Sequence, residues 1–282
     1  MTTPVLKFFA ELVLQRGQRV AFGNASPNGI LLFRAASRVL VAYGSRVAGA
    51  PAPLGASAYA LKYKGVAVCA AILSRALDGG YVNFGVFALY GDPALEAAVR
   101  VTLNLLIGVP PEEVLTFPKV AAQYMIVLHL LARSHIELLV ALPAPAFRQV
   151  IRTLSEGLDS LDNDVAQHAA CAIDALASFF VRSAGKEPPG AHALRAHVAA
   201  MPTMFQVLMG ILFRVLVFDE AHAQSAATWT LVRPLLPVIL AAELVQPDWL
   251  DAYKNELAAS QPADLRARMN DEFMRLARDI TR

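Results

Sequence analysis

Hydrophobic residues recur at three- and four-residue steps along almost the whole chain, which is the spacing of a helix buried on one face. Strand-like alternation of apolar and polar positions is almost absent. Proline and glycine divide this pattern, because proline suits the start of a helix and glycine its end. The sequence therefore predicts an all-α protein. The predicted long helices cover residues 4–16, a segment opened by 26–29, and residues 59–77, 93–108, 118–132, 145–156, 163–183, 202–218, 225–243 and 263–281.

Consecutive predicted helices pair into hairpins with short loops or bridges between them. Bridges at 135–141, 185–199 and 247–258 give the same long-short-long arrangement in several units. Repeated hairpins of roughly 40 to 47 residues are typical of HEAT and armadillo arrays. We therefore predict a HEAT-repeat-like α-solenoid, with residues 1–282 forming one segment of about five hairpins. Terminal repeats normally carry polar caps, and neither end has one here, so a piece of a longer array is expected.

The segment from 81 to 93 is unusual in its aromatic spacing. Glycines precede it at 79–80, and a Gly-Asp-Pro sequence ends it, so it is bounded by a helix stop and a new helix start. We predict a short connecting helix whose rings wedge between longer helices. A three-residue step moves around an α-helix, so the rings should contact more than one neighbour. The aromatic residues are Tyr81, Phe84, Phe87 and Tyr90, and the segment also carries Asn83 and Asp92.

Composition supports buried helices in an array. The chain of 282 residues is 56% hydrophobic and only 17% charged. A membrane-spanning helix needs roughly 20 predominantly apolar residues in a row, and none was identified, so membrane insertion is not predicted. The amino-terminal segment lacks the basic region and long apolar core of a secretory signal.

Charge and cysteine content narrow the function classes. A net charge of +2, with basic residues scattered along the chain, gives no support for a nucleic-acid partner. Cys69 and Cys171 lie far apart in apolar helical segments, which predicts free buried thiols in a reducing compartment.

No chemical motif points to catalysis or to a cofactor. The six histidines lack the spacing of a metal site on one helix. The acidic run 159–164 lacks the glycine and terminal glutamate of a calcium loop, and an N-cap at Asp162 or Asn163 explains it better. Since no nucleophile elbow or phosphate-binding glycine loop occurs either, we predict a protein that is not an enzyme and binds no cofactor or metal.

Two pairs of basic residues are candidates for partner contact. Arg34 and Arg38 lie four residues apart on one predicted helix, and Lys62 and Lys64 lie near the start of another. A solvated helix face explains them without any partner. Solenoids usually bind partners through exposed side chains on their inner helices, so these residues are also candidates for partner contact, and both interpretations stay open.

Several segments together resemble the carboxy-terminal part of the exportin-7 family of Ran-binding nuclear transport receptors, within the importin-β superfamily. Residues 26–34 (SPNGILLFR) and 81–92 are the specific ones, and the others are ordinary helix sequence when taken alone. They follow one another in the family's order across nearly the whole chain. The weaker segments are 4–13, 59–65, 155–162, 233–240 and 260–262.

The resemblance implies a receptor that binds protein cargo and Ran-GTP, contacts nuclear pore proteins and shuttles between nucleus and cytoplasm. It also implies that Ran is bound mainly by repeats upstream of this chain. A rival hypothesis is a HEAT-repeat scaffold or adaptor with no role in nuclear transport. Helical periodicity fits both, and only the resemblance separates them.

Overall fold

The computed structural model describes residues 3–14, 26–48, 57–218, 228–259 and 275. Within these ranges the chain is helical, with no strand. The helices are α1 (Thr3–Leu14), α2 (Pro27–Val47), the π-helical turn η1 (Tyr59–Tyr63), α3 (Lys64–Asp78), α4 (Gly85–Leu89), α5 (Ala94–Ile107), α6 (Pro111–Val114), α7 (Pro118–Ser134), α8 (Ile136–Val140), α9 (Ala144–Leu158), α10 (Asn163–Arg182), α11 (Ala191–Ala200), α12 (Met204–Phe218), α14 (Thr228–Val232), α15 (Leu235–Val245) and α16 (Trp249–Ala259).

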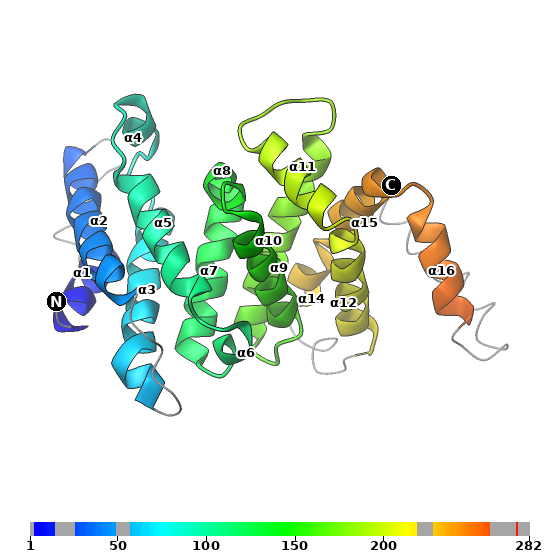
Figure 1. The fold of residues 1–282 in the computed structure, drawn as a ribbon, viewed down its shortest axis with the longest axis horizontal. Coiled ribbons are helices and arrows are strands. Elements are labelled where there is room, and N and C mark those ends of the chain that lie inside the picture. The colour runs from blue at the N-terminus through cyan, green and yellow to red at the C-terminus, as the bar shows by residue number, and fades with distance from the viewer. Residues whose placement is uncertain (1–2, 15–25, 49–56, 219–227, 260–274, 276–282) are drawn as a thin grey trace.

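The long helices form two layers that run along the molecule (Figure 1). In the first layer, α1, α3, α7, α10 and α15 pack side by side in that order. In the second layer, α2, α5, α9 and α12 do the same. Each helix mainly contacts its neighbours, which is the organisation of a solenoid. The predicted all-α, HEAT-repeat-like class is confirmed.

Short helices connect the two layers. Figure 1 shows α4, α8 and α11 at one edge of the array, where each links a first-layer helix to the second-layer helix of the same hairpin. The helix α6 lies at the opposite edge and joins one hairpin to the next. The predicted long-short-long arrangement is therefore present from α3 to α12.

Helix ends follow the capping chemistry expected from the sequence. The Ser26 hydroxyl accepts a hydrogen bond from the Asn28 amide at 3.3 Å, at the start of α2. Asp162 accepts bonds from the amides of Asp164 and Val165 at the start of α10, which confirms a cap in the acidic run. Gly80, at φ +66°, follows the end of α3 with the left-handed backbone that favours glycine.

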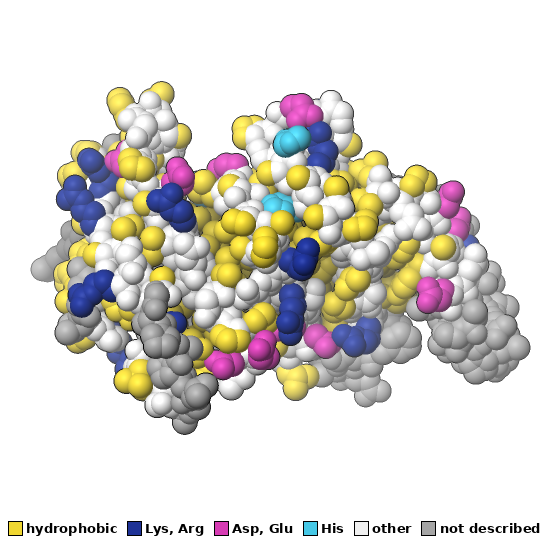
Figure 2. All heavy atoms as spheres, in the orientation of Figure 1, with side chains coloured by type: hydrophobic (Ala, Val, Ile, Leu, Met, Phe, Trp, Pro, Cys, Tyr) yellow, Lys and Arg dark blue, Asp and Glu magenta, His cyan; other side chains and the backbone are white. Residues whose placement is uncertain are grey.

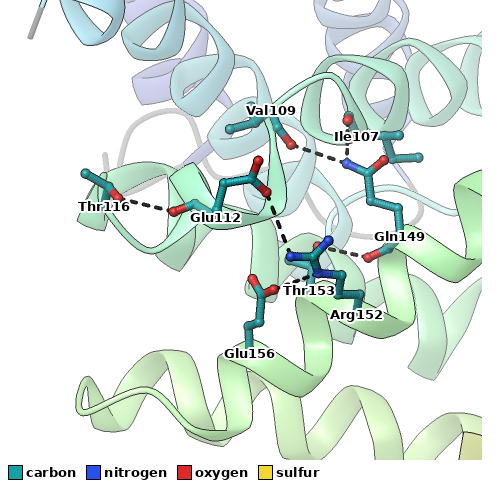
Figure 3. A network of polar contacts seen from close by, with 8 residues as sticks. All are labelled: Ile107, Val109, Glu112, Thr116, Gln149, Arg152, Thr153 and Glu156. Atoms are coloured by element: carbon teal, nitrogen blue, oxygen red, sulfur yellow. Dashed lines mark hydrogen bonds and ion pairs between the residues drawn. The ribbon is translucent and has the colours of Figure 1, made fainter. Parts of the chain in front are cut away.

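Polar contacts fix α9 against the preceding hairpin (Figure 3). The Gln149 amide nitrogen donates to the carbonyl oxygens of Ile107, at 2.6 Å, and Val109, at 3.3 Å. The carbonyl groups at a helix end lack partners within the helix, so Gln149 satisfies one at the end of α5. Nearby, Arg152 Nε lies 2.9 Å from Glu156 Oε1, and an Arg152 Nη lies 3.9 Å from Glu112 Oε2. These bonds set the position of α9 relative to α5 and α6.

The fifth hairpin differs from the prediction. The expected helix 225–243 is divided into α14 and α15 around Arg233 and Pro234. Proline has no amide hydrogen to donate and clashes with the preceding turn, so Pro234 precedes α15 and does not lie inside a helix. The short helix α6 was not predicted. The loop after residue 14 lies outside the described residues, and so does the expected helix 263–281 apart from residue 275.

One stretch of the described chain is long and apolar enough to cross a membrane, Thr228–Val245. The sequence analysis did not single it out. It comprises α14 and α15 with the break between them, and these two helices pack on α10 and α12. Buried side chains along it include Leu231, Leu235 and Val238. Two further helical segments are long and apolar enough to cross a membrane only when they are taken together, and the chain bends by 79° between them. They are Ala191–Ala200 and Met204–Leu216. In both places the apolar residues contribute to the core between the layers.

Candidate partner-binding surface

The two segments that carry the resemblance lie against each other in the structure. Gly29, at the start of α2, contacts the backbone carbonyl of Tyr81, and a β-carbon at position 29 would overlap that oxygen. Tyr81 itself is buried. Only glycine allows this approach between the two backbones, so the SPNG sequence and the aromatic segment form one structural unit.

Aromatic contacts extend this unit into the core. The ring of Phe33 is fully buried, and it meets Phe84 and Phe87 edge to face with centroid distances of 5.0 and 5.3 Å. Phe84 also contacts the ring of His135, which follows α7, at 5.5 Å. The prediction that these rings wedge between neighbouring elements is therefore confirmed for Tyr81, Phe84 and Phe87.

Tyr90 contradicts that prediction. Its relative exposure is 78%, and that of its neighbour Leu89 is also 78%. The helix α4 ends at Leu89, and Gly91 at φ +63° turns the chain away, so the three-residue step does not carry the last ring to the core. Asn83 is also exposed, and its side-chain oxygen accepts a bond from the Gly85 amide at 3.2 Å.

Arg34 is joined to the same unit by an ion pair. Its Nε atom lies 3.0 Å from Oδ2 of Asp92, while Oδ1 of Asp92 accepts a bond from the Ala94 amide at 3.0 Å. The relative exposure of the Arg34 side chain is 48%. It is thus held in place from one side and open to solvent from the other.

Arg38 is the other residue of the first predicted pair. It is exposed, and no carboxylate of the described residues forms an ion pair with it. Arg34 and Arg38 border a groove of about 450 Å³ between α2 and α5. Below them, the buried Ser37 donates from its hydroxyl to the Ala94 carbonyl at 2.7 Å and ties the two helices together.

The second predicted pair, Lys62 and Lys64, is only partly exposed. Lys62 is 8% exposed, because η1 turns it into the interior, so it does not offer its side chain to a partner there. A π-helical turn has i→i+5 hydrogen bonds and more residues per turn than an α-helix, so it shifts side chains from the positions expected for a regular helix. Lys64 is half-buried and borders a different groove, on the first layer.

All four second-layer helices carry arginine as their only basic residue. We name this set the arginine surface; every member is exposed, and Figure 2 shows Lys and Arg side chains over α2, α5, α9 and α12. Its residues are Arg34, Arg38 and Arg46 on α2, Arg100 on α5, Arg148 and Arg152 on α9, and Arg214 on α12. Arg38, Arg46 and Arg148 lack an ion pair within the described part of the chain.

Comparison with curated proteins gives the decisive observation. The chain is 33% identical to exportin-7-B of Xenopus laevis over 287 aligned residues, covering 99% of this chain. It is 33% identical to human Ran-binding protein 17 over 92% of the chain, and 31% identical to Drosophila melanogaster Ran-binding protein 16 over 97%. This is an exportin-7-like chain. It spans about a quarter of the length of these relatives, 24 to 26%. No family model and no solved structure matches it.

The exportin-7-like chain also brings together two histidines that sequence spacing did not connect. Nδ1 of His129 on α7 lies 3.0 Å from Nδ1 of His168 on α10. Burial, followed by the nearby His168 and Arg133, lowers the pKa of His129 from 6.5 to about 4. Burial also lowers the pKa of His168. Both rings are therefore neutral near pH 7, and one can donate its N–H to the other.

Other candidate ligands in the exportin-7-like chain lie apart. No group of three or more His, Cys, Asp or Glu side chains suited to a metal occurs in the ranges the structure describes. Cys69 is buried as expected, while Cys171 is only partly buried. His197 is buried, stacks on Phe147 at 4.1 Å and bonds to the Val140 carbonyl at 2.9 Å, so it fixes α11 against α8 and α9.

Proposed function

We propose that this chain is one solenoid segment, residues 1–282, of a nuclear transport receptor of the exportin-7 kind. The observation that carries the proposal is similarity over nearly the whole chain to proteins named exportin-7 and Ran-binding protein. The two most specific segments of that resemblance also contact each other, through Gly29 and Tyr81. Such a receptor binds protein cargo, contacts nuclear pore proteins and moves between nucleus and cytoplasm.

Cargo is proposed to contact the arginine surface. Three of its residues lack an ion pair among the described residues, and a guanidinium group binds carboxylates through paired hydrogen bonds. Arg34 is oriented by Asp92 and needs little reordering to make a further bond on its open side. Arg38 borders the adjacent groove between α2 and α5. The second layer thus offers a row of cationic, planar groups over consecutive repeats.

Ran-GTP acts in this proposal as a ligand that shifts the shape of the whole array. Each repeat mainly contacts its neighbours, so small changes between repeats add up along a solenoid. Ran-GTP favours cargo binding only if it binds the cargo-holding shape more tightly than the alternative shape. Ran is bound mainly by repeats outside this chain.

A chimera tests the proposal. The aligned quarter of Xenopus exportin-7-B is replaced by this chain, and capture of an exportin-7 cargo is measured with and without Ran locked in its GTP state. We expect the chimera to keep capture that depends on Ran-GTP. A folded chimera that captures no cargo with Ran-GTP would refute the proposal and favour the HEAT scaffold without a role in transport.

The role of the arginine surface is tested in the same chimera. Reversal of Arg38, Arg46 and Arg148 to glutamate should weaken cargo capture by about tenfold or more, since each exposed ion pair contributes up to about 1 kcal/mol. The matched control reverses Arg182, Lys186 and Arg195, which lie outside the second layer. If both triple variants weaken capture equally, the effect is one of net charge, and cargo does not bind the arginine surface.

A further inference from the structure

A second basic site lies on the first layer, away from the arginine surface. A groove of about 680 Å³ opens between α1, α3 and α7. Small and apolar side chains form much of its lining: Ala10, Ala67, Val68, Ala71 and Ala122. Since these side chains are short, a segment of extended chain can lie close to the three helices.

Three lysines from three different helices border this groove: Lys7 of α1, Lys64 of α3 and Lys119 of α7. Lys7 and Lys119 are exposed, and Lys64 is half-buried. Within the described residues no carboxylate lies at ion-pair distance from any of their ammonium groups. Each of the three long helices therefore contributes one positive charge that has no ion-pair partner among the described residues.

The other charged groups of the groove are already engaged. Arg75 pairs with Glu11 at 3.0 Å and also donates to the Ala10 carbonyl at 2.7 Å. The Asp162 carboxylate accepts bonds from two amides at the start of α10, where the partial positive charge of the helix end offsets its own charge. The described part of the chain thus leaves the three lysine charges uncompensated.

We propose that this groove binds an acidic, extended segment of a partner protein. Carboxylates of that segment contact Lys7, Lys64 and Lys119, and its small side chains lie on the alanine lining. Three ammonium groups are too few for the dense phosphate contacts of a nucleic-acid duplex, and the lining presents short aliphatic groups. The ring of Tyr59 is stacked on Phe117 at 5.8 Å, so this ring is already occupied by an intramolecular contact. The inference does not depend on the proposed transport function.

The experiment uses the 282-residue chain and a short fluorescein-labelled peptide of alternating Glu and Ala. Binding is followed by fluorescence anisotropy. We expect affinity to fall as ionic strength rises from about 0.01 M to about 0.15 M, because the Debye length shortens from about 30 Å to about 8 Å. A peptide with Gln in place of every Glu should show no measurable binding.

Charge reversal locates the bound peptide. Lys7→Glu, Lys64→Glu and Lys119→Glu together should raise the Kd about tenfold or more, the summed effect of three exposed ion pairs. The matched control reverses Arg182, Lys186 and Arg195, which lie outside both this groove and the second layer, changes the net charge by the same amount and should leave the Kd nearly unchanged. If the lysine triple variant loses its helical circular dichroism, the pair Lys7→Glu and Lys119→Glu, both exposed, replaces it.

Three results would overturn the proposal. One is equal loss of binding in the lysine variant and in the control variant, which would mean attraction by net charge alone. Another is that the lysine reversals leave the Kd of the acidic peptide unchanged, or that the Gln peptide binds as well as the Glu peptide. The third is that the acidic peptide does not bind, while a labelled DNA duplex binds and loses its binding in the lysine variant. That result would assign the groove to nucleic acid.

Discussion

Arg34 and Asp92 lie 58 positions apart in sequence, yet Nε of Arg34 is 3.0 Å from Oδ2 of Asp92. Asp92 has a second role, since its Oδ1 accepts the Ala94 amide at the start of α5. One carboxylate therefore holds the orientation of an arginine on α2 and the start of the neighbouring second-layer helix.

Replacing Asp92 should cost more stability than replacing Arg34. For Asp92→Ala we expect a loss of about 1 to 2 kcal/mol, the sum of a lost helix cap and a lost ion pair. For Arg34→Ala we expect about 0.5 kcal/mol or less, because that side chain is half exposed and the cap remains. Urea denaturation measures both. The control is Glu96→Ala, which removes only the 4.0 Å pair with Arg100. Equal losses for Asp92 and Arg34 would contradict the role of Asp92 as a cap.

A glycine exchange tests the contact between the two specific segments. Gly29→Ala places a methyl group against the Tyr81 carbonyl, and a backbone neighbour cannot yield as a flexible side chain does. We expect a loss of about 1 to 3 kcal/mol or more from overpacking. Gly210→Ala in α12 is the matched control, because nothing lies within 4 Å of the added carbon. There alanine should raise stability by up to about 1 kcal/mol, since it forms helix better than glycine. The same sign for both changes would argue against the close approach at Gly29.

The aromatic segment should divide into a packing part and an exposed part. Phe33→Ala removes a buried ring that contacts Phe84 and Phe87, and we expect a loss of about 3 to 5 kcal/mol. Tyr90→Ala should change stability by about 0.5 kcal/mol or less, because the side chain is exposed. Thermal unfolding of both variants distinguishes the two roles. A large effect at Tyr90 would restore the sequence-based expectation that all four rings form the wedge.

Local chemistry made most helix boundaries predictable. Ser26, Asp162 and Gly80 have side chains or backbone freedom that act within a few residues, so their roles could be inferred from sequence alone. The break before α15 carried a local signal too, since Pro234 suits a position just before a helix and Pro237 lies in its first turn. The prediction of one helix over 225–243 missed that signal because apolar residues recur at helical spacing on both sides of Pro234.

The candidate surface was less predictable, because its contacts join residues from different helices. Sequence spacing singled out Arg34 and Arg38 but gave no indication that Asp92 would pair with Arg34. The burial of Lys62 depends on the π-helical turn, which has no clear sequence mark. The sequence analysis overlooked Arg148 on α9. A signal was present, because assigning alternate predicted helices to two layers would have shown that arginine is the only basic residue type on the second-layer helices. Tertiary packing, and not local propensity, decides these positions.

The histidine pair should make stability depend on pH. The pKa of His129 falls from 6.5 to about 4 in the folded state, so the unfolded chain takes up a proton near pH 6.5 while the folded chain stays neutral. Protons therefore favour unfolding as the pH falls. Stability should be fully present above about pH 6.5 and decrease from there toward about pH 4.

Removing both titrating rings should flatten this profile. In His129→Gln with His168→Gln, two amides can still form a hydrogen bond across α7 and α10, but neither takes up a proton in this range. Urea midpoints measured between about pH 7 and about pH 5 should then differ less than those of the natural chain. His192→Gln, at an exposed position on α11, is the matched control and should keep the natural slope. If the double variant and the natural chain lose stability in parallel, the contact between His129 and His168 does not govern the response, and other groups of the protein determine it.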